Sequence, residues 1–369
     1  MKHSRSGRLA GVAVVGTLAL AGCGSDDNSD GSPTGSSSAS GTIDCASGTI
    51  NSSGSTAQSN AMTQWIKEYQ TACGDATINY TGGGSGQGIT DFSNGQTAFA
   101  GSDSALNPDK GEVAKADARC KTGKALNIPM VAGPIAVVYN LEGVDGLVLT
   151  PSVLAKIFSG KITTWNDPQI AKLNSGVSLP STKITSVHRS DSSGTTSNVT
   201  KYLEAAAKAD WTFGHDKQWK APGGQGAAKS DGIAAAVKSA PNTISYVEWS
   251  YATESDLSIA KIDNGGGAVE LTADAVSKAV AAAEVTGTGD DLTMKLDYAT
   301  KVPGAYPLLL VTYEITCQKG LQPEQATLVK SFLTHTASEE GQAKLVELGY
   351  APLPTEILAK VQKTVATIS

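Results

Sequence analysis

The sequence predicts an α/β protein that is large enough for two domains. Short runs rich in β-branched residues alternate with segments in which apolar residues recur every three to four positions. This alternation is typical of an α/β architecture. More than 300 residues follow position 42, which is enough chain to bury two hydrophobic cores. We find no internal repeat.

The first 22 residues predict an export signal. Lys2, Arg5 and Arg8 precede an apolar stretch at 9–20 that is too short to span a bilayer. The stretch ends in Leu-Ala-Gly-Cys at 20–23, which resembles a bacterial lipobox. That resemblance implies that Cys23 is lipidated and becomes the mature N-terminus. The alternative is an ordinary signal peptide that happens to carry a cysteine.

A polar segment rich in Gly, Ser, Asp and Asn occupies residues 24–41. It has almost nothing to bury, so we expect a flexible tether from Cys23 to position 41, with an r.m.s. reach of about 20–25 Å. Such a tether suits a folded unit held near a membrane.

The folded part contains candidate strands and helices in alternation. The strand candidates are 49–50, 77–80, 128–139, 184–187, 244–247 and 307–315. The helix candidates are 61–69, 151–158, 197–208, 231–238, 273–283, 323–334 and 338–348.

The charge balance restricts the class of partner. Without Lys2, Arg5 and Arg8 of the signal, 26 basic residues remain against 35 acidic ones. A chain this acidic, without a basic stripe, argues against nucleic acid. It does not exclude a small anion, because a closed site acts through local dipoles rather than net charge.

Four cysteines follow Cys23, at positions 45, 73, 120 and 317. An even number in an exported protein predicts two disulfides. No CxxC pair is present, so neither a zinc site nor a redox motif is indicated. Four separate buried thiols would be the alternative in a cytosolic protein.

Small, hydroxyl-rich turns follow several strand ends and open helices. These turns are 53–56, 84–86, 101–104 and 192–195. The first N–H groups of a helix have no intrahelical acceptor and carry partial positive charge, so such turns can bind a small tetrahedral anion. Each turn alone could equally be an ordinary N-cap. Their recurrence at strand ends, where open α/β sheets bind ligands, favours a site.

The turn that begins at Arg189 is the most informative. It leaves the strand candidate 184–187 and enters a helix. The arginine offers a planar fork of donors suited to phosphate, and Asp191 is close enough in sequence to hold that fork. A surface Arg–Asp pair on a turn is the alternative.

These residues together resemble the substrate-binding lipoproteins of the high-affinity phosphate ABC transporter, the PstS-like proteins. The resemblance covers nearly all of the chain after the tether. It rests on the segments 54–56, 80–88, 100–103, 158–165, 189–195, 231–233, 244–248 and 353–354, which stand in family order.

The resemblance implies a phosphate site. The residues expected to bind phosphate oxygens are Thr56, Ala57, Ser85, Arg189, Ser193, Gly194 and Thr195. Ala57 and Gly194 would act through their backbone N–H groups. Relatives often carry a bulky apolar residue in place of Ala57, so local packing there is open. Asp103 would accept a hydrogen bond from the proton that phosphate keeps, and Asp191 would steady Arg189.

The resemblance also implies a two-lobed periplasmic-binding-protein fold with two hinge crossings, expected at 133–139 and 302–309. Lobe one would comprise 42–136 and 304–369, and lobe two 137–303. Ligand would then bridge the lobes and stabilise the closed form. The implied partners are inorganic phosphate, a membrane permease and the membrane through the lipid anchor. The protein would be a monomer outside the cytoplasm, without a cofactor or metal.

The disulfide pairing follows from these lobe assignments. Cys73 ends the first helix and Cys120 follows the turn 101–104 in lobe one, so we predict a bond between them. Cys45 begins lobe one and Cys317 ends the returning strand, so we predict the second bond between these two.

Two other classes of function remain as alternatives. A phosphatase could also carry anion-binding turns, but it needs a nucleophile or metal ions. No HExxH, GxSxG, P-loop or GxGxxG pattern is present. A carbohydrate- or peptide-binding lipoprotein would need a stacking platform, and the five tryptophans have no spacing that suggests one.

Overall fold

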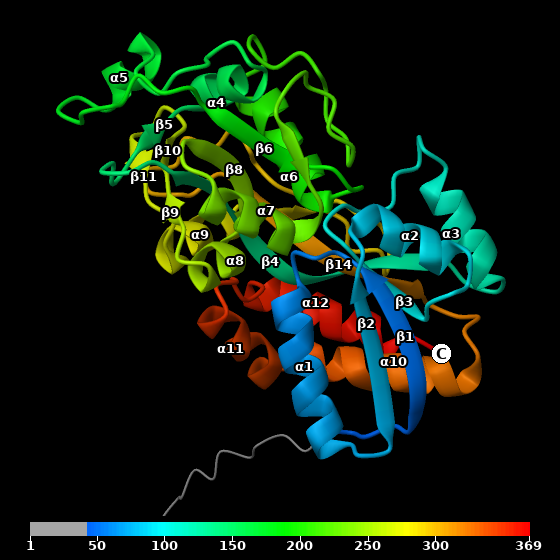
Figure 1. The fold of residues 1–369 in the computed structure, drawn as a ribbon. Helices are drawn as coiled ribbons and strands as arrows, with labels where there is room; N and C mark the ends of the chain where they lie inside the picture. Colours follow the sequence, from blue (N-terminus) through cyan, green and yellow to red (C-terminus); the bar gives the residue numbers. More distant parts are fainter. Residues whose placement is uncertain (1–42) are drawn as a thin grey trace, which may run out of the picture. The chain divides into compact units, whose positions relative to one another are not determined.

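The computed structural model describes residues 43–369. The expected signal peptide at 1–22, the lipidation site Cys23 and the tether 23–41 lie outside the described residues. The described part is a mixed α/β fold, as the sequence predicts (Figure 1). None of its helices has the length and apolar character that a membrane span requires.

Strands and helices alternate along the described chain. The strands are β1 (Gly48–Gly54), β2 (Ala76–Gly82), β3 (Phe99–Ser102), β4 (Ala125–Asn140), β5 (Val148–Leu149), β6 (Thr185–Arg189), β7 (Gln225–Ala227), β8 (Thr243–Glu248), β9 (Ser258–Ile259), β10 (Lys261–Asp263), β11 (Ala268–Val269), β12 (Glu284–Val285), β13 (Met294–Lys295) and β14 (Leu309–Cys317). The helices are α1 (Ser59–Ala72), α2 (Ser85–Ser93), α3 (Glu112–Cys120), α4 (Pro151–Phe158), α5 (Pro168–Leu173), α6 (Gly194–Ala206), α7 (Lys229–Ser239), α8 (Trp249–Glu254), α9 (Ala273–Val280), α10 (Pro323–Thr336), α11 (Glu339–Glu347) and α12 (Thr355–Ala366).

One large sheet runs through the described chain in the order β2-β1-β3-β14-β4-β8-β6-β7, and β9 also pairs with β4. Strands β1, β2 and β3 are mutually parallel where they pair, whereas β14 is antiparallel to both β3 and β4. On the other side, β8 is antiparallel to β4 and parallel to β6. The parallel strands β1, β2, β3 and β6 are the ones that precede the four hydroxyl-rich turns.

The long strand β4 connects the two halves of this sheet (Figure 1). Its first part, up to Pro134, pairs with β14, and its second part, from Ile135 to Asn140, pairs with β8. Leu309 at the start of β14 lies opposite Pro134, so the returning chain meets β4 where β4 changes partner. The two hinge crossings are predicted at these segments, and their role as a hinge stays a prediction.

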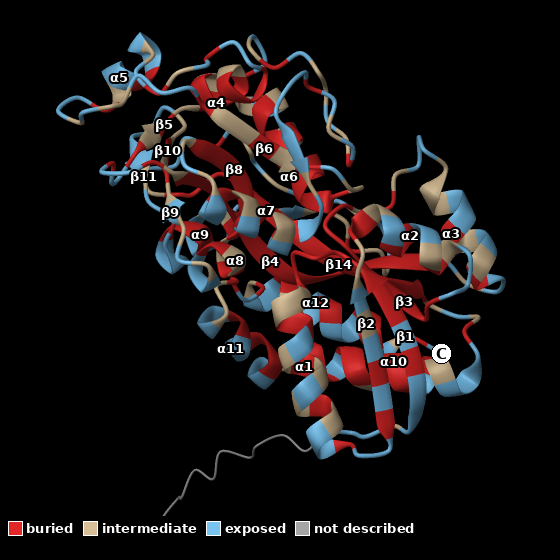
Figure 2. Ribbon diagram, in the orientation of Figure 1, coloured by how far each residue is buried: buried red, intermediate tan, exposed pale blue. Residues whose placement is uncertain are grey.

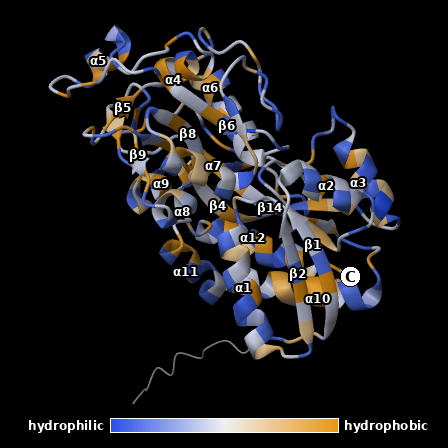
Figure 3. Ribbon diagram, viewed as in Figure 1, coloured by the Kyte–Doolittle hydropathy of each residue, from blue (hydrophilic) through white to orange (hydrophobic). Residues whose placement is uncertain are grey.

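Buried residues form two hydrophobic clusters. One is built largely on α1, α10, α12 and the strands β1–β3, and the other on α4, α6, α7 and the strands around β8. Figure 2 shows β3, β4 and β14 buried almost throughout, and Figure 3 shows strongly hydrophobic residues on α4 and α10. Leu292 and Met294 belong to the first cluster, although the expected boundary assigns them to lobe two. The exact lobe boundaries stay a prediction.

The four described cysteines form two disulfides, but the predicted pairing was wrong. The bonds are Cys45–Cys73 and Cys120–Cys317 instead of Cys73–Cys120 and Cys45–Cys317. Strand register explains both bonds. Gly48 of β1 lies opposite Ala76 of β2, and the first pair of cysteines stands three residues before these positions. Cys317 lies opposite Ala125, shortly after Cys120 at the end of α3.

Candidate functional site

Two of the hydroxyl-rich turns lie side by side because β1 and β3 are parallel neighbours. Gly54 ends β1 opposite Gly101, and the Ser55 N–H donates to the Gly101 carbonyl at 2.8 Å. Gly54 has a φ of +138°, and a Cβ there would lie 2.0 Å from the Gly101 oxygen. Only glycine allows this close approach. The result places Ser55 and Asp103 face to face.

The Asp103 carboxylate is buried among hydroxyl groups. Its Oδ1 accepts from Ser55 Oγ at 2.5 Å and from Thr312 Oγ1 at 2.7 Å, and its Oδ2 accepts from Ser85 Oγ at 3.0 Å. Burial raises the pKa of Asp103 to about 6, with Glu248 adding to the shift, while the three hydroxyl bonds oppose it. Asp103 is therefore a hydrogen-bond acceptor that stays ionised at neutral pH, although its burial disfavours the charged form.

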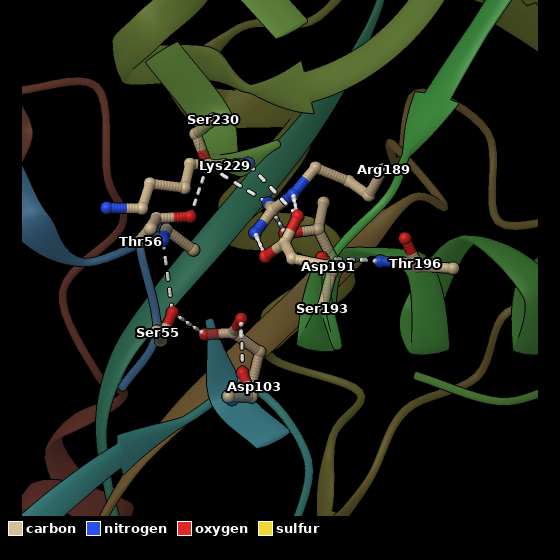
Figure 4. A network of polar contacts seen from close by, with 12 residues as sticks. Ser55, Thr56, Asp103, Arg189, Asp191, Ser193, Thr196, Lys229 and Ser230 are labelled. Atoms are coloured by element: carbon tan, nitrogen blue, oxygen red, sulfur yellow. Dashed lines mark hydrogen bonds and ion pairs between the residues drawn. The ribbon is translucent and has the colours of Figure 1, made fainter. Parts of the chain in front are cut away.

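Arg189 ends β6 and is held by Asp191 through two parallel hydrogen bonds (Figure 4). Nε donates to Oδ1 at 2.7 Å and Nη2 donates to Oδ2 at 2.5 Å. The side chain is only 2% exposed, and burial alone would lower the pKa of Arg189, but the hydrogen bonds and charge of Asp191 outweigh it and raise the pKa. The remaining nitrogen, Nη1, points to Ser230 Oγ at 3.2 Å and Thr195 Oγ1 at 3.5 Å.

Short contacts connect the Arg189 group with the Asp103 group. Thr56 Oγ1 and Ser230 Oγ lie 2.7 Å apart, so Ser230 contacts both Thr56 and Arg189 (Figure 4). A Cβ at Gly194 would lie 2.4 Å from Ser85 Oγ and 2.5 Å from Asp103 Oδ2, so the start of α6 is pressed against these residues.

All the residues predicted to bind phosphate lie in this cluster, but several use their donors within it. Ser193 is the N-cap of α6: its hydroxyl oxygen accepts from the Thr196 N–H at 3.2 Å, and its own N–H donates to the Lys217 carbonyl at 3.0 Å. The Ala57 N–H donates to Ser55 Oγ at 3.0 Å. The Thr195 hydroxyl donates to Glu248 Oε1. Their individual roles toward a ligand stay predictions.

The cluster has the chemistry of an anion site. It combines a fixed guanidinium, hydroxyl donors and the N-termini of α2 and α6, where N–H groups lack intrahelical acceptors. Within residues 43–369 no group of three or more His, Cys, Asp or Glu side chains is arranged to hold a metal ion. One buried carboxylate, Asp103, faces these donors and gives the site an acceptor as well.

Comparison with known proteins agrees with this chemistry. The pattern of the PBP superfamily domain matches residues 36–340. The chain is 44% identical to the phosphate-binding protein PstS 3 of Mycobacterium tuberculosis over 374 residues, covering 100% of both chains. It is 35% identical to the phosphate-binding protein PstS of Methanocaldococcus jannaschii, covering 80% of this chain and 79% of that one. The chain belongs to the PstS family.

Solved structures share the fold of this PstS-family chain. A high-affinity periplasmic phosphate-binding protein, PfluDING, bound with phosphate, aligns with a TM-score of 0.70 at 24% identity, over 86% of this chain and 93% of that one. A putative phosphate ABC transporter substrate-binding protein with bound phosphate from Clostridium perfringens aligns with a TM-score of 0.61 at 20% identity, over 83% of this chain and 100% of that one.

The structure adds site residues of this PstS-family chain that sequence reasoning missed. Ser230 and Glu248 contact Arg189 and Thr195, and Thr312 binds Asp103. Asn198, one turn into α6, donates to the Asp103 carbonyl at 2.6 Å. A signal existed for two of them, because Ser230 precedes the family segment 231–233 and Glu248 ends the segment 244–248. Nothing in the sequence marked Thr312.

Glu314 of β14 is a further buried carboxyl beneath the site. Among the described residues neither of its oxygens makes a hydrogen bond of ordinary geometry, although the Gln58 side chain is close enough to oppose the shift of its pKa. Burial raises the pKa of Glu314 to about 8, and the negative charge of Asp103 adds to this. Glu314 is therefore mostly protonated at neutral pH.

This raised pKa predicts how stability depends on pH. Between pH 4.5 and 8 an unfolded chain has lost the Glu314 proton while the folded chain keeps it, so the free energy of unfolding falls as pH rises. Asp103 acts with the same sign, but only between about pH 4 and 6. We expect the Tm of the parent to drop by a few degrees between pH 6.5 and 8, and Glu314→Gln to reduce that drop. Thermal unfolding checks this, with the exposed Glu347→Gln as control; equal drops in all three proteins would contradict it.

The tight packing around Gly194 predicts that a single methyl group weakens ligand binding. In Gly194→Ala the new Cβ would meet Ser85 and Asp103 at about 2.5 Å. Overpacking costs about 1–3 kcal/mol, and because the Ser85 hydroxyl can rotate away we expect about 1–2 kcal/mol of lost phosphate affinity. The control is Gly232→Ala in α7, where a Cβ meets nothing closer than 4.0 Å. Calorimetry that finds both variants equal to the parent would rule out this closed packing in the bound state.

Proposed function

We propose that this protein binds inorganic phosphate outside the cytoplasmic membrane and delivers it to an ABC importer. One observation carries the proposal: a buried arginine, fixed by Asp191 through two nitrogens, directs its third nitrogen at the hydroxyl groups of Ser230 and Thr195. A guanidinium held in this way is suited to a tetrahedral oxyanion. The family membership supports phosphate as that oxyanion, since relatives carry the name phosphate-binding protein.

The residues proposed to contact phosphate divide between the two proposed lobes. Thr56, Ser85 and Asp103 belong to lobe one (42–136 and 304–369), whereas Arg189 and residues 193–195 belong to lobe two (137–303). Phosphate that forms hydrogen bonds with both sets would favour the closed form over the open one. The strand β4 and the start of β14 would supply the hinge, because both chain segments cross between the lobes there.

Delivery requires a membrane partner and a way to stay near it. We propose that Cys23 carries a lipid anchor and that residues 23–41 form the tether, after removal of the signal peptide 1–22. The folded unit would act as a monomer that presents phosphate to the permease. We assign it no catalytic role, because a binding protein of this family transfers its ligand unchanged.

Titration of ligand-stripped protein tests the proposal. The mature chain is unfolded and refolded to remove bound ligand, then titrated with phosphate, arsenate and sulfate by calorimetry. We expect one tight site for phosphate and much weaker binding of sulfate. Absence of phosphate binding would overturn the proposal. Turnover of a chromogenic phosphate ester that disappears in Arg189→Ala would instead support the alternative that the protein is a phosphatase.

A further inference from the structure

A cavity of about 400 Å³ lies directly behind Asp103. Its walls are formed by residues 103–105, 107–110, 197–198, 201, 215–217, 293–296, 298, 311 and 313. Asp103 and Asn198 line the cavity and also belong to the anion site, since the Asn198 amide donates to the carbonyls of Asp103 and Gly194. An ion in this cavity would therefore lie next to the site.

Several charged residues in the cavity wall already have charged partners. Lys217, which is buried, donates to both carboxylate oxygens of Glu112 at 2.9 and 3.1 Å. Asp216 pairs with Lys110 at 2.7 Å and with Lys220 at 2.6 Å. The Lys217–Glu112 pair is neutral, whereas Asp216 with Lys110 and Lys220 keeps one positive charge, which lies on the exposed lysine side chains.

Lys201 differs from these residues because its side chain has no charged partner among the described residues. It lies on α6 one turn beyond residues 197–198, which places it on the same face of the helix, and it lines the cavity. Among the described residues the Lys201 ammonium forms no hydrogen bond or ion pair. Burial lowers the pKa of Lys201, and the positive charge of Lys217 lowers it further. Lys295, which is exposed, also lines the cavity without an ion pair in the described part of the chain, while Asp109 is the opposing exposed carboxylate.

We propose that this cavity is an entry subsite, in which Lys201 captures a tetrahedral oxyanion before it moves to the site at Arg189. The inference rests on the proposed function. The chain as a whole carries a formal net charge of −6 and repels anions at long range. An unpaired lysine in a low-dielectric wall beside Asp103 offsets that repulsion locally, and such focusing raises association rates.

An entry subsite affects the rate of association more than the rate of dissociation. Field focusing in charged clefts changes association rates by 10- to 1,000-fold in total, so for one lysine we expect Lys201→Met to slow phosphate association about three- to tenfold. The dissociation rate should stay within a factor of about two, because the Lys201 charge attracts bound phosphate and phosphate leaving through the cavity about equally, so the affinity falls by the same factor as the association rate. Lys208→Met, an exposed lysine shortly after α6 and outside the cavity wall, is the matched control.

Sulfate provides a second readout. We expect Asp103 to disfavour sulfate in the inner site, so sulfate should occupy the outer subsite and slow phosphate association more than sodium chloride of equal ionic strength does. Stopped-flow measurements on the mature chain should show this excess in the parent and in Lys208→Met, and not in Lys201→Met. Equal slowing by both salts in the parent, or a Lys201→Met effect confined to dissociation, would overturn the entry subsite. A parent that does not bind phosphate at all would refute the proposed function instead.

Discussion

Arg189→Ala should lower phosphate affinity by about 2–5 kcal/mol, which is roughly 30- to several-thousand-fold in Kd. Asp191 occupies Nε and Nη2, so Nη1 is the nitrogen directed at Ser230 and Thr195 and toward a ligand. Replacement of Arg189 by alanine removes a charge-assisted hydrogen bond and leaves the charge of phosphate poorly compensated in a buried site. Calorimetry of ligand-stripped protein measures the loss.

Two further variants test which property of Arg189 matters. One distinguishes its bidentate geometry from its positive charge, and the other compares it with an ordinary neutral hydrogen bond. Arg189→Lys keeps the positive charge but cannot bind Asp191 in the same bidentate way, so we expect an affinity between those of the parent and the alanine variant. Thr195→Ala removes one neutral hydroxyl that already donates to Glu248, so the expected loss is about 0.5–1.5 kcal/mol. Equal losses in Arg189→Ala and Thr195→Ala would contradict a dominant role for the arginine.

The fold was predictable from the sequence because its strands and long helices carry strong patterns. The run 128–139 lies within β4, and the helix predicted at 151–158 is α4, where Thr150 caps the first turn and Pro151 occupies its start. Short or polar helices were not predicted. Helix α3 has only two buried residues, and α5 and α8 have six residues each. The amphipathic α12 also went unnoticed, although its pattern is clear.

The turns of the site could be predicted from the sequence, but the residues that approach them from other strands could not. Hydroxyl-rich turns at strand ends have a local signature, so Thr56, Ser85 and Arg189 could be found from sequence. Thr312 and Glu314 lie in the middle of β14, and their approach to Asp103 depends on the pairing of β14 with β3. The disulfide pairing failed for the same reason. The register of neighbouring strands brings the paired cysteines close together, and this long-range pairing cannot be read from the sequence around each cysteine.

Glu248 shows why buried charge is hard to anticipate. It is 1% exposed, and one carboxyl oxygen accepts from the Thr195 hydroxyl while the other has no hydrogen-bond partner among the described residues. It also raises the pKa of both Asp103 and Arg189. The Glu248 carboxylate offsets the positive charge of the Arg189 guanidinium inside the site. In the sequence, however, Glu248 is only a polar residue at the end of a strand.

Asp103 should control selectivity between anions. It does not cap a helix, because its carboxylate accepts from three side-chain hydroxyls and the next helix, α3, begins at Glu112 after Gly111. A carboxylate that faces an anion is unfavourable unless the ligand brings a proton to donate. Phosphate keeps a proton at neutral pH and sulfate does not. Sulfate would therefore leave two charged acceptors facing each other.

Asp103→Asn should relax this discrimination. An unpaired buried acceptor costs about 1–3 kcal/mol, and more when it is charged, so the parent should disfavour sulfate by at least about 3 kcal/mol through this contact. The asparagine amide can donate as well as accept, and we expect the ratio of sulfate to phosphate affinity to rise about 100-fold. Calorimetry at pH 8 measures the ratio, with the exposed Asp145→Asn as the matched control. An unchanged ratio together with a lowered Tm would show that Asp103 serves only stability.

The pKa of Asp103 supplies an independent arm of the same test. Its value of about 6 means that the carboxyl is ionised at pH 8 and largely protonated at pH 5. A protonated carboxyl has an O–H to donate, so sulfate affinity of the parent should rise as pH falls through 6. In Asp103→Asn this group no longer titrates, and sulfate affinity should change much less over the same range. A parent and a variant with the same pH dependence of sulfate binding would show that the proton on Asp103 does not set the choice of anion.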